Sequence, residues 1–301
     1  MFGGRKVNKR TDLALENVEM QPKKQTDGVR SLHQTQNGVR ISAITIFNED
    51  GVRALGKPQG NYVTLELPDR LERPDTRSAA QEILSQQLQR MLPERGTVLV
   101  VGLGNENITP DALGPKCVQL LFATRHISGE LAKQAGFGRL RAVAAIAPGV
   151  LGQTGIETAE IIESLVQRVK PQAVLVIDAL ASCRLTRLGA TIQLTDTGIS
   201  PGSGVGNRRM ELSAHTLGVP VIAIGIPTVV DATTLALDVL QANGVDAPPS
   251  PPLEQSNERL MMVTPKEVDL LLDRAAETLA MGINRALQPE LSEQELLAIV
   301  K

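Results

Sequence analysis

The chain has 301 residues, a formal net charge of −2 and a pI near 6.0, so its length allows one large α/β domain with an ample buried core. No apolar run approaches the roughly 20 residues of a spanning helix, and no apolar segment follows the basic N-terminus, so neither a membrane protein nor a signal peptide is expected. The balanced charge and the 2% aromatic content argue against a direct nucleic-acid partner. The two cysteines, Cys117 and Cys183, are too few for a disulfide framework or a zinc site, which favours buried thiols in a cytosolic protein.

The first 40 residues are polar and mixed in charge, and their lack of periodicity predicts a flexible or processable arm. One apolar island, Thr-Asp-Leu-Ala-Leu at 11–15, interrupts this arm. Apolar and polar residues then alternate over 41–48 and 61–68, which predicts two half-buried strands and a hairpin-like addition to the main domain.

From residue 78 onward, strand and helix patterns alternate, which predicts βαβ units and a mostly parallel, twisted sheet flanked by helices. The expected strands lie at 97–104, 142–149, 173–180, 190–198 and 219–228, and the expected helices at 78–92, 111–127, 157–169, 231–244 and 264–287. For the last helix, Thr264 is expected as N-cap, with Pro265 at N1 and Glu267 completing a capping box. The proline-rich connector at 247–259 excludes regular structure, and a C-terminal tail spans 288–301.

Residues 100–115 open like a dinucleotide-binding loop, with Gly102 and Gly104 in the first two positions of the glycine fingerprint. The third glycine is missing, which disfavours a nucleotide. Thr-Pro at 109–110 is typical of a helix start, where the helix dipole favours the anion of Asp111 by roughly 0.3–1 kcal/mol. Asp111 is therefore either a helix-end charge or a catalytic carboxylate.

Asp178 follows five apolar residues, where desolvation is expected to raise its pKa. Asp111 and Asp178 both follow predicted parallel strands, and ligands gather at the carboxyl ends of such strands. Two carboxylates in one crevice can serve as base and acid when their environments push their pKa values apart. This chemistry activates water against an amide bond.

The glycine-rich segment at 196–213 lacks the Gly-Lys-Ser/Thr of a phosphate-binding loop, so we interpret it as a loop bordering the crevice, with an anion-binding nest as the alternative. Three histidines lie apart from one another and indicate neither a metal site nor a Ser-His-Asp triad. Candidate crevice residues in the loops are Gly102, Gly104, Asn105, Asp196, Gly202 and Gly204.

Several ordered motifs resemble the germination protease family of spore-forming bacteria. They are RTDLALE (10–16), TPDALGP (109–115), PGVLGQTGIET (148–158), IDALA (177–181), TDTGISPGSGVGNRR (195–209), GIPTVVDA (225–232) and LMMVTPKEVD (260–269). The resemblance runs from about residue 10 to 287, and it implies the fold of hydrogenase-maturation proteases, with a single peptidase domain over 41–287.

The resemblance also implies an endopeptidase that begins the degradation of small acid-soluble spore proteins during germination, in the cytoplasm of the forespore or spore core. It implies a homotetrameric zymogen that removes its own propeptide, residues 1–12, by cleavage between Asp12 and Leu13, and then a flexible arm over 13–40. The family's essential aspartates correspond to Asp111 and Asp178. An aspartic-type mechanism without a required metal is favoured, and a metal-dependent peptidase of the same fold or a non-catalytic binder of spore proteins are the alternatives.

Overall fold

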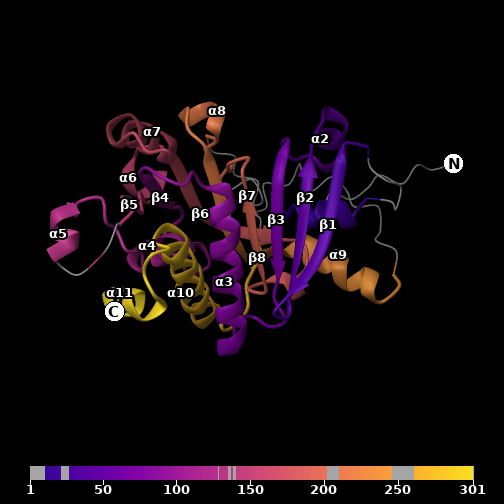
Figure 1. The fold of residues 1–301 in the computed structure, drawn as a ribbon. Coiled ribbons are helices and arrows are strands. Elements are labelled where there is room, and N and C mark those ends of the chain that lie inside the picture. The colour runs from indigo at the N-terminus through magenta and orange to yellow at the C-terminus, as the bar shows by residue number, and fades with distance from the viewer. Residues whose placement is uncertain are drawn as a thin grey trace.

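A computed structural model describes residues 11–21, 27–127, 129–134, 137, 140–201, 210–245 and 261–300. Within these residues, nine strands form one sheet in the order β1-β2-β3-β7-β8-β6-β4-β5, with β9 paired to β8 (Figure 1). The strands are β1 (Val29–Gln36), β2 (Val39–Ile46), β3 (Gly60–Glu66), β4 (Val98–Gly102), β5 (Val143–Ile146), β6 (Ala173–Ser182), β7 (Thr191–Thr195), β8 (Val221–Asp231) and β9 (Met262–Val263).

The sheet has a parallel half and an antiparallel half. β5, β4, β6 and β8 pair in parallel, whereas β1, β2, β3 and β7 follow one another antiparallel and β7 joins β8 antiparallel. The parallel strands are continuous apolar runs because helices cover both of their faces. The predicted α/β class with an antiparallel N-terminal addition is confirmed, and the sheet is mixed rather than mostly parallel because β7 joins the addition to β8 by antiparallel pairing.

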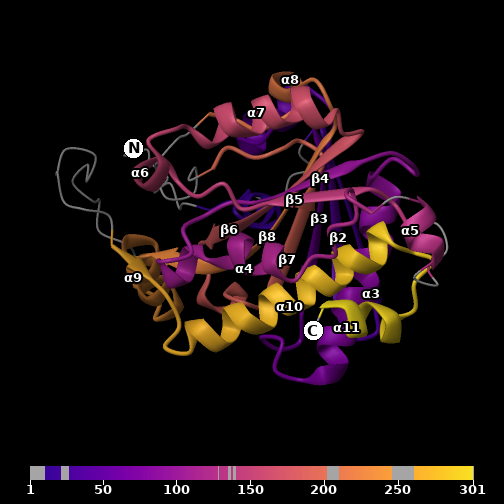
Figure 2. The ribbon, with the colours of Figure 1, turned by 90° about the vertical axis from the view of Figure 1, so that its left-hand side faces the viewer.

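Helices cover the two faces unequally (Figure 2). One face packs against α3, α4 and α10, whose apolar side chains join Leu175 and Ile224 in the largest core cluster. The opposite face packs against α7 at the parallel half and against α1 and α2 at the antiparallel half. The helices are α1 (Ala14–Glu19), α2 (Glu49–Leu55), α3 (Pro74–Met91), α4 (Leu113–Gln119), α5 (Gly129–Gln134), α6 (Leu151–Thr154), α7 (Thr158–Val169), α8 (Ala214–Leu217), α9 (Ala232–Ala242), α10 (Val268–Leu287) and α11 (Glu293–Val300).

The prediction of a flexible arm over residues 13–40 is wrong for two segments. Residues Ala14–Glu19 form α1, and Val29–Gln36 form β1, which pairs with β2 across an Asn37-Gly38 turn. β1 is mostly exposed, so it lacks the apolar alternation that reveals a strand. The Asn-Gly pair, with φ of 49° and 79°, was the available signal for this hairpin.

Two predicted helix starts are also wrong. Residues Thr109–Asp111 form a 3-10 turn, and α4 begins only at Leu113. The C-terminal helix α10 begins at Val268 rather than at a capping box on Thr264, whose hydroxyl instead donates to the Thr228 carbonyl at 2.9 Å. At the first helix start, Thr228 Oγ1 donates to Pro110 O at 2.7 Å. At both starts, therefore, a hydrogen bond with Thr228 on β8 competes with the local helix signal.

The predicted helix over 111–127 ends early, at Gln119. The side chain of Asn284 on α10 accepts from Phe122 N and donates to Leu120 O, and so satisfies the backbone where the helix stops. In the predicted C-terminal tail, Glu293–Val300 form α11. The connector at 247–259 lies outside the described residues, and none of the described helices is long and apolar enough to cross a bilayer.

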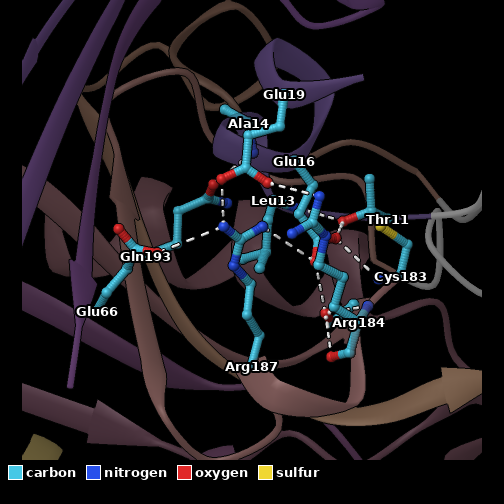
Figure 3. A network of polar contacts seen from close by, with 11 residues as sticks. Thr11, Leu13, Ala14, Glu16, Glu19, Glu66, Cys183, Arg184, Arg187 and Gln193 are labelled. Carbon is cyan, nitrogen blue, oxygen red and sulfur yellow. Dashed lines mark hydrogen bonds and ion pairs between the residues drawn. The ribbon is translucent and has the colours of Figure 1, made fainter. Parts of the chain in front are cut away.

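A buried ion-pair network fixes α1 against the sheet (Figure 3). The Glu16 side chain is fully buried, and its carboxylate accepts from Ser182 Oγ and from Cys183 N, both at 2.8 Å. Its Oε1 atom lies 3.2 Å from Nη1 of Arg187, whose side chain is 8% exposed. The other terminal nitrogen of Arg187 contacts Glu19 at 2.6 Å and Glu66 at 3.4 Å. One arginine therefore neutralises carboxylates from α1 and β3.

Replacing Arg187 with Met should lower the free energy of unfolding by about 3–5 kcal/mol, because the Glu16 carboxylate would stay buried without its cation. Urea unfolding of the full chain measures this loss. The matched control is Arg184→Met, since the Arg184 side chain is 48% exposed and pairs with Glu19 at 3.3 Å, and it should cost at most about 1 kcal/mol. Equal losses in the two variants would contradict the account.

Candidate functional site

Asp178 lies within β6, one residue beyond Ile177, which pairs with the last residue of the neighbouring parallel strand β4. It is 7% exposed, and its Oδ1 atom accepts from Ala179 N at 2.9 Å. Val174 and Val176 precede it at alternate positions and belong to the core beneath α7, so Asp178 projects from that face of the sheet. The burial predicted from the apolar run before it is confirmed.

Asp111 lies at the carboxyl end of the neighbouring strand. β4 ends at Gly102, in register with Ile177, and Leu103 N donates to Ile177 O at 2.8 Å. The chain then turns, and Asp111, which is half-buried, accepts from Asn105 N at 2.8 Å. Adjacent parallel strands thus carry the two aspartates to the same edge of the sheet.

Asn105 organises the loop between β4 and Asp111. Its Oδ1 atom accepts from Asn107 N at 3.0 Å and from Gln153 Nε2 at 2.8 Å. Gln153 belongs to α6, so this contact joins the Asp111 loop to the segment that follows β5. Asn105 therefore lies at the predicted crevice as a structural link between two loops.

The two glycines of the nucleotide-like motif permit close backbone approaches. A Cβ atom on Gly102 would lie 2.2 Å from the carbonyl oxygen of Gly114, at the start of α4. Gly104 has a φ of +114°, and a Cβ there would lie 1.9 Å from the carbonyl oxygen of Asp111. Both glycines bring β4 and the Asp111 turn together, and this accounts for them without a bound nucleotide.

The remaining predicted loop residues lie elsewhere or outside the described residues. Asp196 at the end of β7 accepts from Asn61 N and from Asn61 Nδ2, both at 2.7 Å, so it ties β7 to β3. Gly202 and Gly204 lie outside the described residues. Cys117 and Cys183 are buried as predicted, and burial raises the pKa of the Cys117 thiol.

The segment at residues 11–14 is docked beside this edge of the sheet. Asp12 exchanges hydrogen bonds with Ala181 on β6: its N donates to Ala181 O at 2.9 Å, and its Oδ2 accepts from Ala181 N at 2.8 Å. Leu13 and Ala14 are fully buried. The bond predicted for cleavage, between Asp12 and Leu13, is therefore held in an ordered setting and not in a flexible arm.

Two residues that sequence reasoning missed contact this bond. Lys57 Nζ and Gln193 Nε2 donate to the Asp12 carbonyl oxygen at 3.1 Å and 3.0 Å. Gln193 lies on β7, where a glutamine between buried apolar neighbours was the available signal. Burial lowers the pKa of Lys57, and the charge of Asp12 opposes that shift.

No group of three or more His, Cys, Asp or Glu side chains that could hold a metal ion occurs in the part of the chain that the structure describes. The candidate groups in this region are Asp111 and Asp178 on neighbouring parallel strands, and Lys57 and Gln193 on the carbonyl oxygen of the docked Asp12. Two carboxylates and two nitrogen donors can activate water and polarise a carbonyl group.

Comparisons with known proteins identify relatives of this chain along its length. A family model described as germination protease matches residues 7–242. The germination protease of Caldanaerobacter subterraneus subsp. tengcongensis is 45% identical, over 95% of this chain and 96% of its own length. Those of Clostridium tetani and Priestia megaterium are 43% and 38% identical, each over 95% of this chain, and over 98% and 95% of their own lengths.

One solved structure, the [NiFe] hydrogenase maturation protease HycI from Thermococcus kodakarensis KOD1, aligns with a TM-score of 0.39 at 16% identity. The alignment covers 67% of this chain and 98% of that one.

Replacing Gly102 with Ala should lower the free energy of unfolding by about 1–3 kcal/mol, because the added methyl group meets the backbone of Gly114 and not a flexible side chain. Gly129→Ala is the control, since a Cβ there meets nothing within 4 Å, and it should be neutral to within about 0.5 kcal/mol. Thermal and urea unfolding of both variants measure the difference. A fully stable Gly102→Ala variant would show that β4 and α4 can separate at no cost.

Proposed function

Because the chain belongs to the germination protease family, we propose that it is an endopeptidase that begins the degradation of small acid-soluble spore proteins during spore germination. The observation that supports this proposal is that Asp111 and Asp178 are carried by neighbouring parallel strands, and that Asp12 of the N-terminal segment docks on the strand that bears Asp178. The family relationship supports spore proteins as the class of substrate, and the positions of the aspartates support hydrolysis by activated water.

In the proposed mechanism, Asp111 and Asp178 together activate a water molecule. Asp111 is the more exposed of the two, so we assign it as the base that takes a proton from water. Asp178, at 7% exposure, is the candidate to carry the proton that the leaving amine receives. Paired carboxylates titrate as a unit, so the reverse assignment is the alternative within the same mechanism.

We further propose that the chain is made as a zymogen and removes residues 1–12 by its own activity. The docking of Asp12 on Ala181 and the burial of Leu13 support this, since both hold the bond between them close to the strand that bears Asp178. A homotetrameric assembly and action in the cytoplasm of the forespore or spore core belong to the same proposal, on the strength of the family alone.

Replacing either Asp111 or Asp178 with Asn should abolish loss of residues 1–12 from the purified full-length chain, because no carboxylate pair would remain to move protons. Mass spectrometry of the incubated protein measures the loss. Asp273→Asn is the matched control, since Asp273 is exposed and pairs with Lys116 at 2.6 Å, and it should cleave at the wild-type rate. Wild-type cleavage in either dyad variant would overturn the mechanism.

The same mass measurement with a chelator separates this mechanism from that of a metal-dependent peptidase. Full cleavage after exhaustive chelation supports the aspartate pair, whereas loss restored by one added metal supports the metallopeptidase. A wild-type chain that cuts neither itself nor a Thr-Glu-Ile-Ala peptide would indicate a non-catalytic binder of spore proteins.

A further inference from the structure

The carbonyl oxygen of Asp12 accepts from two side-chain nitrogens. Lys57 Nζ lies 3.1 Å away and Gln193 Nε2 lies 3.0 Å away. Donors at such distances, aimed at the oxygen of a bond under attack, are the structural sign of a site that binds the oxyanion of an acyl-transfer intermediate. Among the contacts of the docked segment, these two donors meet on the carbonyl group of the proposed scissile bond.

The orientation of the Gln193 carboxamide is fixed by a second contact. Ala14 N donates to Gln193 Oε1 at 2.7 Å, so the acceptor end of the amide is engaged on the far side of Leu13. The donor end, Nε2, must then face the Asp12 carbonyl. Gln193 is 6% exposed, which protects this arrangement from competition by water.

Gln193 and Asp178 belong to one row across the sheet. Gln193 on β7 is in register with Gly225 on β8, which is in register with Asp178 on β6. Registered neighbours project from the same face, so both side chains point to the side of the docked segment, roughly 10 Å apart at the backbone over two strand spacings. Gly225 lies between them without a side chain of its own, and the Leu180 side chain packs over it, since a Cβ atom there would lie 2.6 Å from Leu180 Cγ.

Lys57 reaches the same oxygen from the loop between α2 and β3. It follows Gly56, whose φ of 63° ends α2 in a left-handed cap and turns the chain toward Asp12. The Asp12 carboxylate meanwhile accepts from Ala181 N at 2.8 Å. The lysine thus places its ammonium group on the carbonyl oxygen, where negative charge would develop.

We propose that Lys57 and Gln193 are catalytic residues that bind the oxyanion formed at the Asp12 carbonyl during self-cleavage. Water adds its oxygen to the Asp12 carbonyl carbon and gives a proton to the base of the aspartate pair, and the carbonyl electron pair moves onto the oxygen held by the two donors. The bond to Leu13 N then breaks, and that nitrogen takes the proton of the acid. The products are a carboxylate on Asp12 and an amino terminus on Leu13, with water as the sole co-reactant.

This inference rests on the proposed function, and the test keeps the two apart. In the full-length chain, Lys57→Met removes the cation but keeps most of the length of the side chain. Gln193→Glu keeps the acceptor for Ala14 N and removes the donor to Asp12 O. Each variant should lower the first-order rate of self-cleavage by about 100- to 1,000-fold, the usual effect of losing one oxyanion donor.

The controls are Lys116→Met and Gln59→Glu, since these side chains contact Asp273 and Glu49 and not Asp12. Both should cleave within about threefold of wild type, in line with the small effects of surface substitutions. Hydrogen exchange over residues 11–20, read by mass spectrometry, shows whether the segment stays docked in each variant.

Protected segments with slow cleavage in Lys57→Met and Gln193→Glu support the inference. Cleavage within threefold of wild type in both variants overturns it, and so does loss of docking, because the side chains would then act in binding the segment rather than in catalysis. A wild-type chain that does not cleave itself counts against the proposed function instead.

Discussion

A carboxylate without contact with water must be matched by donors inside the protein, and Glu16 is such a group. Ser182, Cys183 and Arg187 supply those donors at the end of β6 and in the turn that follows it. Because the match is specific, α1 can sit in one register only. That register determines where Asp12, four residues earlier, meets the sheet.

The parallel and antiparallel halves of the sheet contribute different side chains to the proposed site. The parallel half carries Asp111 in the turn after β4 and Asp178 within β6, one residue beyond the partner of the last residue of β4. The antiparallel half carries Gln193 on β7, and the loop before β3 carries Lys57. β8 joins the halves, because it pairs in parallel with β6 and antiparallel with β7. The proposed site therefore depends on the mixed topology of the sheet, since neither half carries both the two aspartates and the two nitrogen donors.

Much of this arrangement could be read from the sequence. The apolar runs of β4 and β6 predicted the parallel strands and placed Asp111 and Asp178 at one edge, because buried strands and their carboxyl ends obey local rules. The close approach of Gly102 to Gly114 could not be predicted, since it depends on which helix packs on the strand. The helix start at Thr264 was mispredicted for a similar reason: its hydroxyl finds a carbonyl on β8.

The N-terminal segment shows the limit of composition as a guide. Its polar composition predicted a flexible arm. The Glu16 carboxylate instead anchors the segment, because this charged side chain is buried and pairs with Arg187. Lys57 escaped sequence reasoning because its partner is the backbone of Asp12, which no side-chain pattern reveals, whereas Gln193 left one signal, a polar residue between buried apolar neighbours.

The central claim is that each chain presents its own Asp12–Leu13 bond to its own site. The most direct test mixes full-length wild-type protein with a full-length Asp178→Asn chain that is isotopically labelled, and follows both masses over a range of concentrations. The account predicts that the wild-type chain loses residues 1–12 at a rate independent of concentration while the labelled chain, whose Leu13 is buried, stays whole. Cleavage of the labelled chain at a rate that rises with wild-type concentration would contradict it.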